Sequence, residues 1–600
     1  MSKEAPTQRY PRPDFERIDL QWQSLNGEWD FAFDDDDVGL RERWYGKGAC
    51  IPNNKKRKIS VPFVYQTRAS NINEQQAHQI VWYQRTLHAI PGPHLDNQER
   101  RMVLRFGAVD YYATVWLDGI LLGSHQGGHV PFEFDTAGRL NEREPSTLSI
   151  RVWDAATDLT QPRGKQYWAA KPEGIFYTPS TGIWQSVWLE DVPVVRIADS
   201  SHGTLLSSNN IESGDLSAEI AVHGRQKTQS CFITIIAILA GVEVAKSEPT
   251  QVDLEEDIAR LKLDLRLSAD HQAQLPSAFT EAHTLTDESC WQNGLALWSP
   301  EHPLLYDLLI ILSDEAGKVL DEIKTTTGMR SLDWTRGDGT FRLNNRPYFQ
   351  ALVLDQGYWP DTNMTPPNVD SCREDILLGK KMGFNGCRKH QKVEDPLFLY
   401  WADRLGYLVW GEMANGYKFS NQYVRRFDQE WMEAVRRDIN HPCIVTWTPI
   451  NETWGYEALK DSTAEQNHIR SLYYMTKTLD PTRSINDNCG WEHVSTDLTT
   501  FHDYSDGQEL AKICQNMESI LQPKSGRDMF IGGAVHQLGA PVICTEFGGV
   551  NIAMQGDTAV EGSWGYTTAS DAKDLLARVR RLMLGVVEGG HCCGFVYTQL

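Results

Sequence analysis

Two glutamates come directly after apolar, β-branched runs, and a pair of carboxyl groups placed in this way can carry acid–base or nucleophilic chemistry. Glu452 ends the run over 443–451, and Glu546 ends the run over 541–545. Runs of this kind are typical of strands that are buried on both faces of a parallel sheet. Because the carboxyl ends of parallel barrel strands meet at one mouth, we expect the two glutamates to share one active site.

Most acidic residues of the chain need another explanation. The sequence contains 80 Asp and Glu residues, and we expect most of them to be solvated surface. Glu452 and Glu546 differ because no turn residue separates them from the preceding run, which holds the charge near the core. Cleavage of a glycosidic bond needs two such groups, one acid for the leaving oxygen and one nucleophile or base for the anomeric carbon.

Composition limits the possible partners. The 600 residues are 41% hydrophobic and 23% charged, which is typical of a globular multidomain protein. A formal net charge of −22 argues against nucleic acid or an anionic membrane as a partner and favours a neutral ligand. The N-terminus has no apolar signal region, so we expect a cytoplasmic location and no membrane association. The 11 Cys residues lack metal-ligand spacing and are expected to be reduced core thiols.

The first part of the chain has the pattern of antiparallel β-structure. Period-2 alternation at 28–33, 81–87 and 113–119, broken by glycine-containing turns, predicts a jelly-roll-like β-sandwich over residues 1–195. Apolar segments at 216–222, 231–238 and 308–312 are separated by longer polar stretches and predict an immunoglobulin-like sandwich over 196–328.

From residue 329 the pattern changes to strands that alternate with helices. Helical periodicity is present at 369–382, 396–405, 422–437, 465–479 and 571–587. Strands are expected at 348–354, 383–388, 408–412, 444–450, 484–486, 498–504, 542–546 and 594–599. Alternation of this kind predicts a (β/α)8 TIM barrel over residues 329–600, with catalytic groups at the C-terminal strand ends.

Short motifs in this order carry a family resemblance across nearly the whole chain. In the barrel they are Gly383-Phe-Asn-Gly-Cys-Arg388, Trp410-Gly-Glu412, Asn440-His-Pro-Cys-Ile-Val445, Asn451-Glu452, Asp480-Pro-Thr-Arg483, His502-Asp-Tyr504 and Thr545-Glu-Phe-Gly548. Before it, Leu25-Asn-Gly-Glu-Trp29, Gly182-Ile-Trp184 and Gly328-Met-Arg330 extend the likeness. The ordered set resembles glycoside hydrolase family 2, which contains β-galactosidases, β-glucuronidases and β-mannosidases.

The resemblance implies roles for individual residues. Glu452 matches the acid/base of the family and Glu546 its nucleophile. Asn451 matches the group that bonds the sugar 2-hydroxyl, and Tyr504 the phenol beside the nucleophile. Many members have a Ser-His pair after Arg388 where this chain has His390-Gln391, so we expect different polar contacts at that edge of the sugar.

Further candidates for substrate contact carry less specific signals. Arg388 and Glu412 end the second and third barrel strands and could form a structural ion pair or position Glu546 and the sugar. Asp355 ends the first strand, where it could bond a hydroxyl or act as a cap, and His502 belongs to the motif of Tyr504. Aromatic residues that could stack on a sugar or simply fill the core are Trp491, Trp564 and Tyr597.

The expected protein is a retaining exo-β-glycosidase that needs no cofactor and no metal. A β-galactopyranoside is the first expectation for its substrate, followed by a β-galactofuranoside, a β-glucuronide and a β-mannoside. A carbohydrate-binding protein on an inactive hydrolase scaffold is the rival hypothesis, which the presence of both carboxylates disfavours. A homo-oligomer is possible. Leu600 follows the eighth expected strand directly, and the family's glucuronate-reading Asn-x-Lys motif would fall beyond it.

Overall fold

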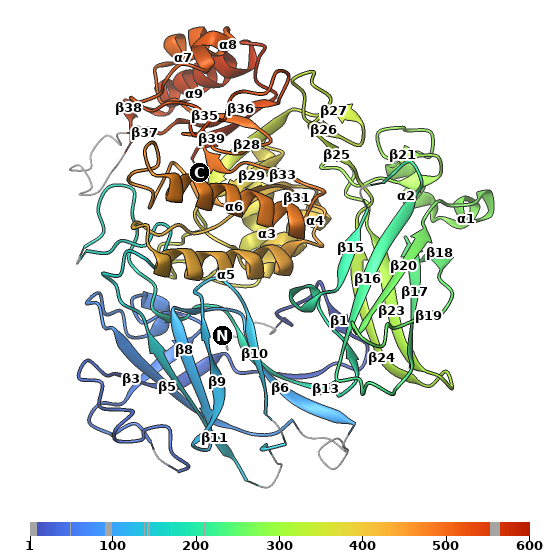
Figure 1. The fold of residues 1–600 in the computed structure, drawn as a ribbon, viewed down its shortest axis with the longest axis vertical. Coiled ribbons are helices and arrows are strands. Elements are labelled where there is room, and N and C mark those ends of the chain that lie inside the picture. The colour runs from blue at the N-terminus through green and yellow to red at the C-terminus, as the bar shows by residue number, and fades with distance from the viewer. Residues whose placement is uncertain are drawn as a thin grey trace.

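Three regions follow one another along the chain. The computed structural model describes residues 9–48, 50–90, 99–136, 138–140, 144–169, 171–208, 210–552 and 565–599. Figure 1 shows an N-terminal sandwich in blue, a second sandwich in green, and a barrel in yellow to red that lies against both. No helix of the described residues combines the length and the apolar character needed to cross a membrane.

The N-terminal sandwich consists of two antiparallel sheets. One has the order β4 (Arg57–Val61), β3 (Gly27–Phe33), β5 (Ile80–Leu87), β11 (Ser146–Trp153), β8 (Tyr112–Leu117), β9 (Ile120–Gln126). The other has the order β10 (Phe132–Asp135), β6 (Arg100–Phe106), β13 (Val187–Pro193), β2 (Gln21–Ser24). Between the sheets lies a core that includes Phe31, Tyr83 and Leu104. A sandwich is confirmed here, whereas the jelly-roll winding stays a prediction.

A long connection leaves this sandwich between β11 and β13. We call residues 154–181 the crossing loop; all of it except Ala170 is described. The loop is followed by β12 (Gly182–Ile183), which pairs with β7 (Val109–Asp110). A short 3-10 helix, η1 (Arg68–Ser70), lies elsewhere in this region.

The second sandwich is the predicted immunoglobulin-like domain. One sheet contains β14 (Arg196–Ile197), β16 (Asp215–His223), β15 (Leu205–Ser207) and β20 (Ile258–Asp264). The other contains β1 (Glu16–Arg17), β24 (Val319–Thr327), β23 (Tyr306–Asp314), β17 (Cys231–Leu239), β18 (Val242–Lys246) and β19 (Thr250–Gln251). Smaller elements are η3 (Ser200–His202), α1 (Ala269–Gln274), α2 (Ser277–Ala282), β21 (Trp291–Gln292) and β22 (Leu295–Ala296). Alternate residues of β17 are buried, as a strand with one core face requires.

The barrel contains the eight predicted parallel strands. Their order around the sheet is β33 (Ser484–Ile485), β31 (Ile444–Thr448), β30 (Leu408–Glu412), β29 (Gly386–Lys389), β28 (Gln350–Asp355), β39 (Gly594–Thr598), β36 (Val542–Gly548), β35 (Thr499–His502). Its helices are α3 (Ser371–Lys381), α4 (Pro396–Leu405), α5 (Asn421–Asp438), α6 (Thr463–Leu479), α7 (Gly507–Cys514), α8 (Met517–Ile520) and α9 (Ala572–Val587). Short strands accompany them: β25 (Leu332–Asp333), β26 (Arg342–Leu343), β27 (Arg346–Pro347), β32 (Ile450–Asn451), β34 (Asn488–Cys489), β37 (Val550–Ile552) and β38 (Thr567–Ala569).

The curled sheet meets at a seam between the fifth and sixth strands. In the described part of the chain, β33 and β35 lie at the two ends of the strand order. Side chains bridge them: Asp497 accepts from the Ile485 backbone N–H at 2.7 Å, and the Thr500 hydroxyl donates to Asn486 at 3.0 Å. The first bond satisfies a backbone N–H at this edge of the sheet, and the second joins side chains across the seam.

Local signals explain why the barrel helices begin where they do. Asp395 caps α4 by accepting from the Leu397 N–H, Pro396 occupies its first turn, and Gly406 ends it in the left-handed region.

Helix α5 runs along the N-terminal sandwich (Figure 1), where Glu430 accepts a 2.7 Å hydrogen bond from the His129 N–H. This contact fixes the sandwich against the barrel.

Candidate active site

The two catalytic candidates meet at the barrel mouth. Glu452 follows β32, and Glu546 lies in β36. One side-chain oxygen of each glutamate and one ring nitrogen of His502 all lie within 4.8 Å of one another. This separation is close to the roughly 5–5.5 Å of retaining glycosidases and below the 6.5–9.5 Å of inverting ones. Glu452 has a φ of 50°, in the left-handed region that costs energy for a residue with a Cβ and is often found at functional sites.

His502 lies between the two carboxylates. Its Nδ1 is 2.6 Å from Glu452 Oε1, and its Nε2 is 3.6 Å from Glu546 Oε1. Burial alone would lower the pKa of His502, but the charge of Glu546 and the hydrogen bonds to Cys489 and Glu452 raise it to about 10. The imidazole is therefore protonated at neutral pH and donates to Glu452.

Glu546 is held as a carboxylate. Arg388 Nη1 donates to its Oε1 at 3.0 Å, and the Tyr504 hydroxyl donates to its Oε2 at 2.5 Å. Burial raises the pKa of Glu546, but the charges of His502 and Arg388 outweigh burial and hold it at about 2. An ionised, hydrogen-bonded carboxylate facing a cavity is suited to nucleophilic attack.

Arg388 connects the nucleophile to its neighbours. It is fully buried, donates through Nε to Glu412 at 2.6 Å and donates through Nη2 to Asn451 Oδ1 at 2.5 Å. Burial raises the pKa of Glu412, and the Arg388 charge opposes that rise. Asn451 Nδ2 is buried and has no hydrogen-bond partner among the described residues. A buried donor without a partner is rare, so this amide is available for a substrate hydroxyl.

A cavity of about 160 Å³ opens beside the glutamates. Its lining consists of Lys165, Gly174, Ile175, Phe176, Tyr177, Leu354, Gln356, His390, Glu452, Glu546, Tyr566, Thr598 and Gln599. The volume lies below the roughly 300–1,000 Å³ of pockets for drug-sized ligands, which suits a single sugar ring. Five of these residues come from the crossing loop of the N-terminal sandwich.

Tyr566 and Lys165 are two of the cavity residues that were not predicted from the sequence. Tyr566 stacks on Tyr504 with ring centroids 3.6 Å apart. Lys165 enters from the crossing loop. The sequence carries no local signal for either contact, because each depends on which distant segment folds over the barrel mouth.

The other predicted site residues have different positions. His390 lines the cavity, accepts from Arg388 at 3.2 Å, and has a pKa that burial, Lys165 and Arg388 lower well below its usual value. Asp355 accepts from Lys389 at 2.6 Å and from the Gly357 N–H at 2.9 Å, so it caps the strand end.

Trp491 and Tyr597, two of the three aromatic candidates, do not line the cavity. The guanidinium carbon of Arg527 lies over Trp491, 4.4 Å from the centroid of the Trp491 ring. Tyr597 packs in the barrel core against Phe547, with ring centroids 5.5 Å apart, so its role is core filling. Trp564 lies outside the described residues.

Gln391 does not face the cavity, contrary to our expectation that it reads the sugar. Its Nε2 donates to Asn415 Oδ1 at 3.0 Å, and its Oε1 accepts from the Asn415 N–H at 2.7 Å. Asn415 Oδ1 also accepts from the Asn451 N–H at 2.8 Å. Both ends of the Gln391 amide are thus bonded to Asn415, which in turn bonds Asn451. Gln391 therefore positions Asn451 through Asn415.

Replacing Gln391 by Ala is expected to slow hydrolysis of every accepted sugar by a similar factor of about tenfold. Loss of one positioning hydrogen bond on each side of Asn415 loosens Asn451 whatever sugar is bound. The measurement is kcat/KM for aryl β-glucuronide and β-galactoside. A change of more than tenfold in the ratio of the two values would show instead that Gln391 discriminates between sugars.

The charges of His502 and Glu546 predict a pH-dependent contribution to stability. The pKa of His502 is raised from 6.5 to about 10, so its contribution is full below pH 6.5 and is lost as pH rises through 10. The pKa of Glu546 is lowered from 4.5 to about 2, so its contribution is full above pH 4.5 and is lost as pH falls through 2. The His502→Asn variant should lower Tm most between pH 4.5 and pH 6.5, where both contributions are full, by at least about 3 °C. A Tm difference that is constant from pH 4.5 to pH 10 would contradict this account.

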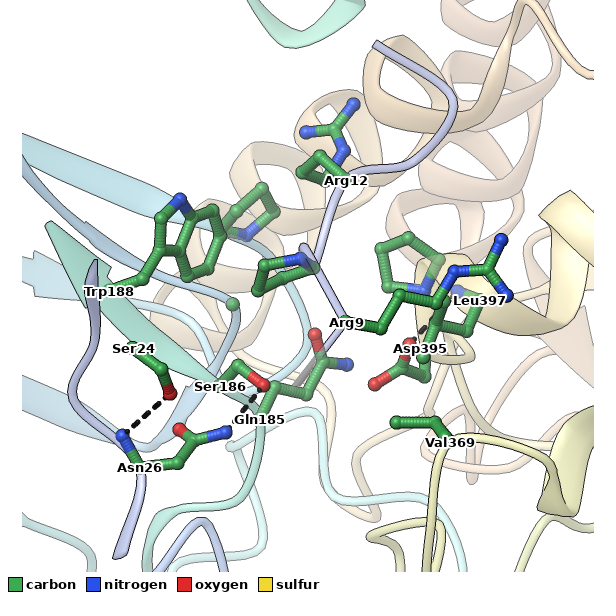
Figure 2. A pocket seen from close by; sticks show the side chains of 14 residues that line it. Arg9, Arg12, Ser24, Asn26, Gln185, Ser186, Trp188, Val369, Asp395 and Leu397 are labelled. Carbon is green, nitrogen blue, oxygen red and sulfur yellow. Dashed lines mark hydrogen bonds between the residues drawn. The ribbon is translucent and has the colours of Figure 1, made fainter. Parts of the chain in front are cut away.

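A second cavity, of about 210 Å³, lies where the N-terminal segment crosses between the first sandwich and the barrel (Figure 2). Arg9, Gln185 and Asp395 are among its lining residues. Asp395 accepts from the Leu397 N–H as the cap of α4, so its carboxylate is already used structurally. The described residues that line this cavity include no pair of carboxyl groups, so it is not the candidate active site.

An eight-stranded parallel barrel with two glutamates close together at its mouth has the arrangement that a glycoside hydrolase requires. The chain belongs to glycosyl hydrolase family 2. It matches the family's sugar binding domain over residues 22–193, a further glycosyl hydrolases family 2 model over 195–330 and the family's TIM barrel domain over 365–561.

Curated proteins and solved structures resemble this chain over most of its length. A β-glucuronidase of Felis catus is 25% identical over 583 residues, which cover 87% of this chain and 80% of the relative. A β-galactosidase of Thermoanaerobacter pseudethanolicus is 23% identical over 406 residues, covering 66% of this chain and 48% of the relative. The structure of Bacteroides uniformis β-glucuronidase 2, covalently bound to cyclophellitol-6-carboxylate aziridine, superposes with a TM-score of 0.70 at 19% identity. This match covers 97% of the chain and 65% of that structure, and it supports the fold.

Proposed function

We propose that this chain is a retaining exo-β-glycosidase that hydrolyses terminal β-glucuronides. The observation that carries the reaction type is the pair of Glu452 and Glu546 oxygens within 4.8 Å of each other and of the His502 ring, beside a cavity for one sugar. In the first step, a Glu546 oxygen attacks the anomeric carbon while Glu452 gives its proton to the leaving oxygen. In the second step, Glu452 takes a proton from water, which displaces Glu546 from the sugar.

The surrounding residues have separate tasks in these two steps. His502 donates to one oxygen of Glu452, which leaves the other oxygen for the glycosidic bond. Arg388 and Tyr504 hold Glu546 in the orientation for attack. The Asn451 amide, which has no partner for its Nδ2 among the described residues, donates to the sugar 2-hydroxyl, a bond that strengthens as charge develops.

The sugar proposed here differs from the first expectation. A β-galactoside is the first expectation from the sequence, but several curated relatives that cover most of the chain are β-glucuronidases. β-Galactosidases are also among the relatives, and a β-galactoside is the second candidate. The rival hypothesis of an inactive binding protein is disfavoured by the intact hydrogen bonds around both glutamates. The cytoplasmic location and the oligomeric state stay predictions.

Hydrolysis of a substrate panel tests this proposal. Purified protein is assayed with p-nitrophenyl β-glucuronide, β-galactopyranoside, β-galactofuranoside and β-mannoside, and the configuration of the first-formed sugar is read by NMR. We expect the glucuronide to have the highest kcat/KM and the β-anomer to appear first. Preference for another sugar would overturn the substrate, and an α-anomer as first product would overturn the retaining mechanism.

A further inference from the structure

The crossing loop of the N-terminal sandwich brings a lysine into the catalytic cavity. Lys165 is 4% exposed and lines the same cavity as Glu452 and Glu546. Its ammonium lies 4.6 Å from the centroid of the Trp454 ring. Within the ranges that the structure describes, this ammonium makes no ion pair and no hydrogen bond.

The backbone around Lys165 is firmly attached to the barrel. The N–H groups of Arg163 and Gly164 both donate to the Asn415 carbonyl, at 3.1 and 2.9 Å, and the Tyr417 hydroxyl donates to the Gly164 carbonyl at 2.5 Å. Gly164 has a φ of 60°, and a Cβ there would lie 2.2 Å from the Gln391 carbonyl oxygen. Only glycine permits this close approach, so the position of Lys165 is set by the contact between the two domains.

A second anchor holds the far side of Lys165. The Tyr177 N–H donates to the Lys165 carbonyl at 2.9 Å. The adjacent Gln166 side chain donates to Asp110 at 2.7 Å and accepts from the Ser180 N–H at 2.7 Å. The lysine is therefore presented to the cavity by a loop that is bonded on both sides, which is the preorganisation that a binding residue needs.

The ammonium is poorly compensated where it lies. Burial lowers the pKa of Lys165 to about 8, and the carboxylates of Glu546, Glu452 and Glu412 counteract only part of this effect. Those carboxylates already accept hydrogen bonds from other groups. A buried cation without its own partner is costly, and contact with an aromatic face offsets only part of that cost. A ligand that brings an anionic group into the cavity would supply the missing partner.

We propose that Lys165 binds the carboxylate of the uronic acid and so selects uronides over neutral sugars. This inference rests on the proposed function and names a residue for its specificity. A carboxylate suits the position because it can accept a charge-assisted hydrogen bond, whereas a hydroxymethyl group can offer only a neutral oxygen. The alternative is that Lys165 only balances the charge of the catalytic glutamates, in which case its loss would affect all sugars alike.

The test compares Lys165→Met with Lys165→Arg and the control Lys171→Met. Lys171 is an exposed lysine of the same loop. For each protein, kcat and KM are measured with p-nitrophenyl β-glucuronide and p-nitrophenyl β-glucoside, which differ only at C6. Competitive inhibition by D-glucuronate and by D-glucose is measured as well, and Tm confirms folding.

We expect Lys165→Met to raise both KM for the glucuronide and the inhibition constant of D-glucuronate by at least about 30-fold. The constants for glucoside and glucose should change by less than about threefold. Lys165→Arg should recover most of the loss, and Lys171→Met should behave as wild type.

Two different failures can be told apart. A wild-type enzyme that cleaves neutral β-glycosides but no glucuronide overturns the proposed function and, with it, the role of Lys165. A wild-type enzyme that prefers glucuronide, with a Lys165→Met variant that loses both sugars equally, overturns the role of Lys165 alone.

Discussion

Replacing Glu546 by Gln is expected to lower kcat for an activated aryl β-glycoside by at least about 10⁴-fold, because no covalent intermediate can form without the nucleophile. Gln can still accept from Arg388 and contact Tyr504, which bond the two oxygens of Glu546 in the wild type. The fold should therefore be kept, and Tm checks this. The loss should appear at every pH at which the wild type is active, since the pKa of Glu546 is about 2.

A mechanism-based label tests the same assignment directly. A 2-deoxy-2-fluoro glycosyl fluoride of the preferred sugar should modify one peptide of the wild type, at Glu546, and none of the variant. Glu465→Gln is a matched control, because Glu465 is also buried but lies on α6, accepts from the Ala458 N–H and does not line the cavity. Label on another carboxylate, or a Glu546→Gln variant with wild-type activity, would remove Glu546 from the role of nucleophile.

Replacing Glu452 by Ala is expected to separate substrates by their leaving groups. Hydrolysis of an alkyl or oligosaccharide glycoside should fall by about 10²–10⁴-fold, because its leaving oxygen needs a proton. Dinitrophenolate leaves without protonation, so formation of the glycosyl-enzyme from a dinitrophenyl glycoside should change little. Steady-state and burst-phase kinetics on both substrates measure this difference.

Added azide provides a second measurement on the Glu452→Ala variant. The space left by the side chain admits a small anion, which attacks the glycosyl intermediate without base assistance. We expect azide to restore turnover of the activated substrate and to give a β-glycosyl azide. Equal losses for both leaving groups, together with no azide product, would contradict the acid/base role of Glu452.

The elements predicted best are those whose signals are local. The structure has α4 at Pro396–Leu405 and β30 at Leu408–Glu412, with the predicted bounds. A cap, a first-turn proline and a terminal glycine define that helix without any tertiary contact. By contrast, the second barrel strand was predicted from residue 383 and begins at Gly386, where pairing with β28 begins. The ends of a strand depend on its partner, which a single segment of sequence does not encode.

The catalytic pair was predictable for a related reason. A carboxylate directly after an apolar run is a sequence feature, and the barrel topology brings the carboxyl ends of the strands together at one mouth. The direction of a side chain within that mouth is a different matter. Gln391 turns toward Asn415, and Tyr597 turns into the core, because neighbouring segments offer them partners there.

The sequence by itself thus determined the barrel, the two sandwiches and the identity of the two glutamates, since strand periodicity, helix caps and strand-end residues are local properties. Only the tertiary structure decided what surrounds the sugar. Lys165 reaches the cavity because Gly164 allows the crossing loop to approach Gln391 and Asn415 closely. His502 acquires its charge because folding places it between two carboxylates that lie far apart in the sequence. Burial and charge proximity exist only after distant segments meet, and they set the pKa values and the free polar groups on which the proposed chemistry depends.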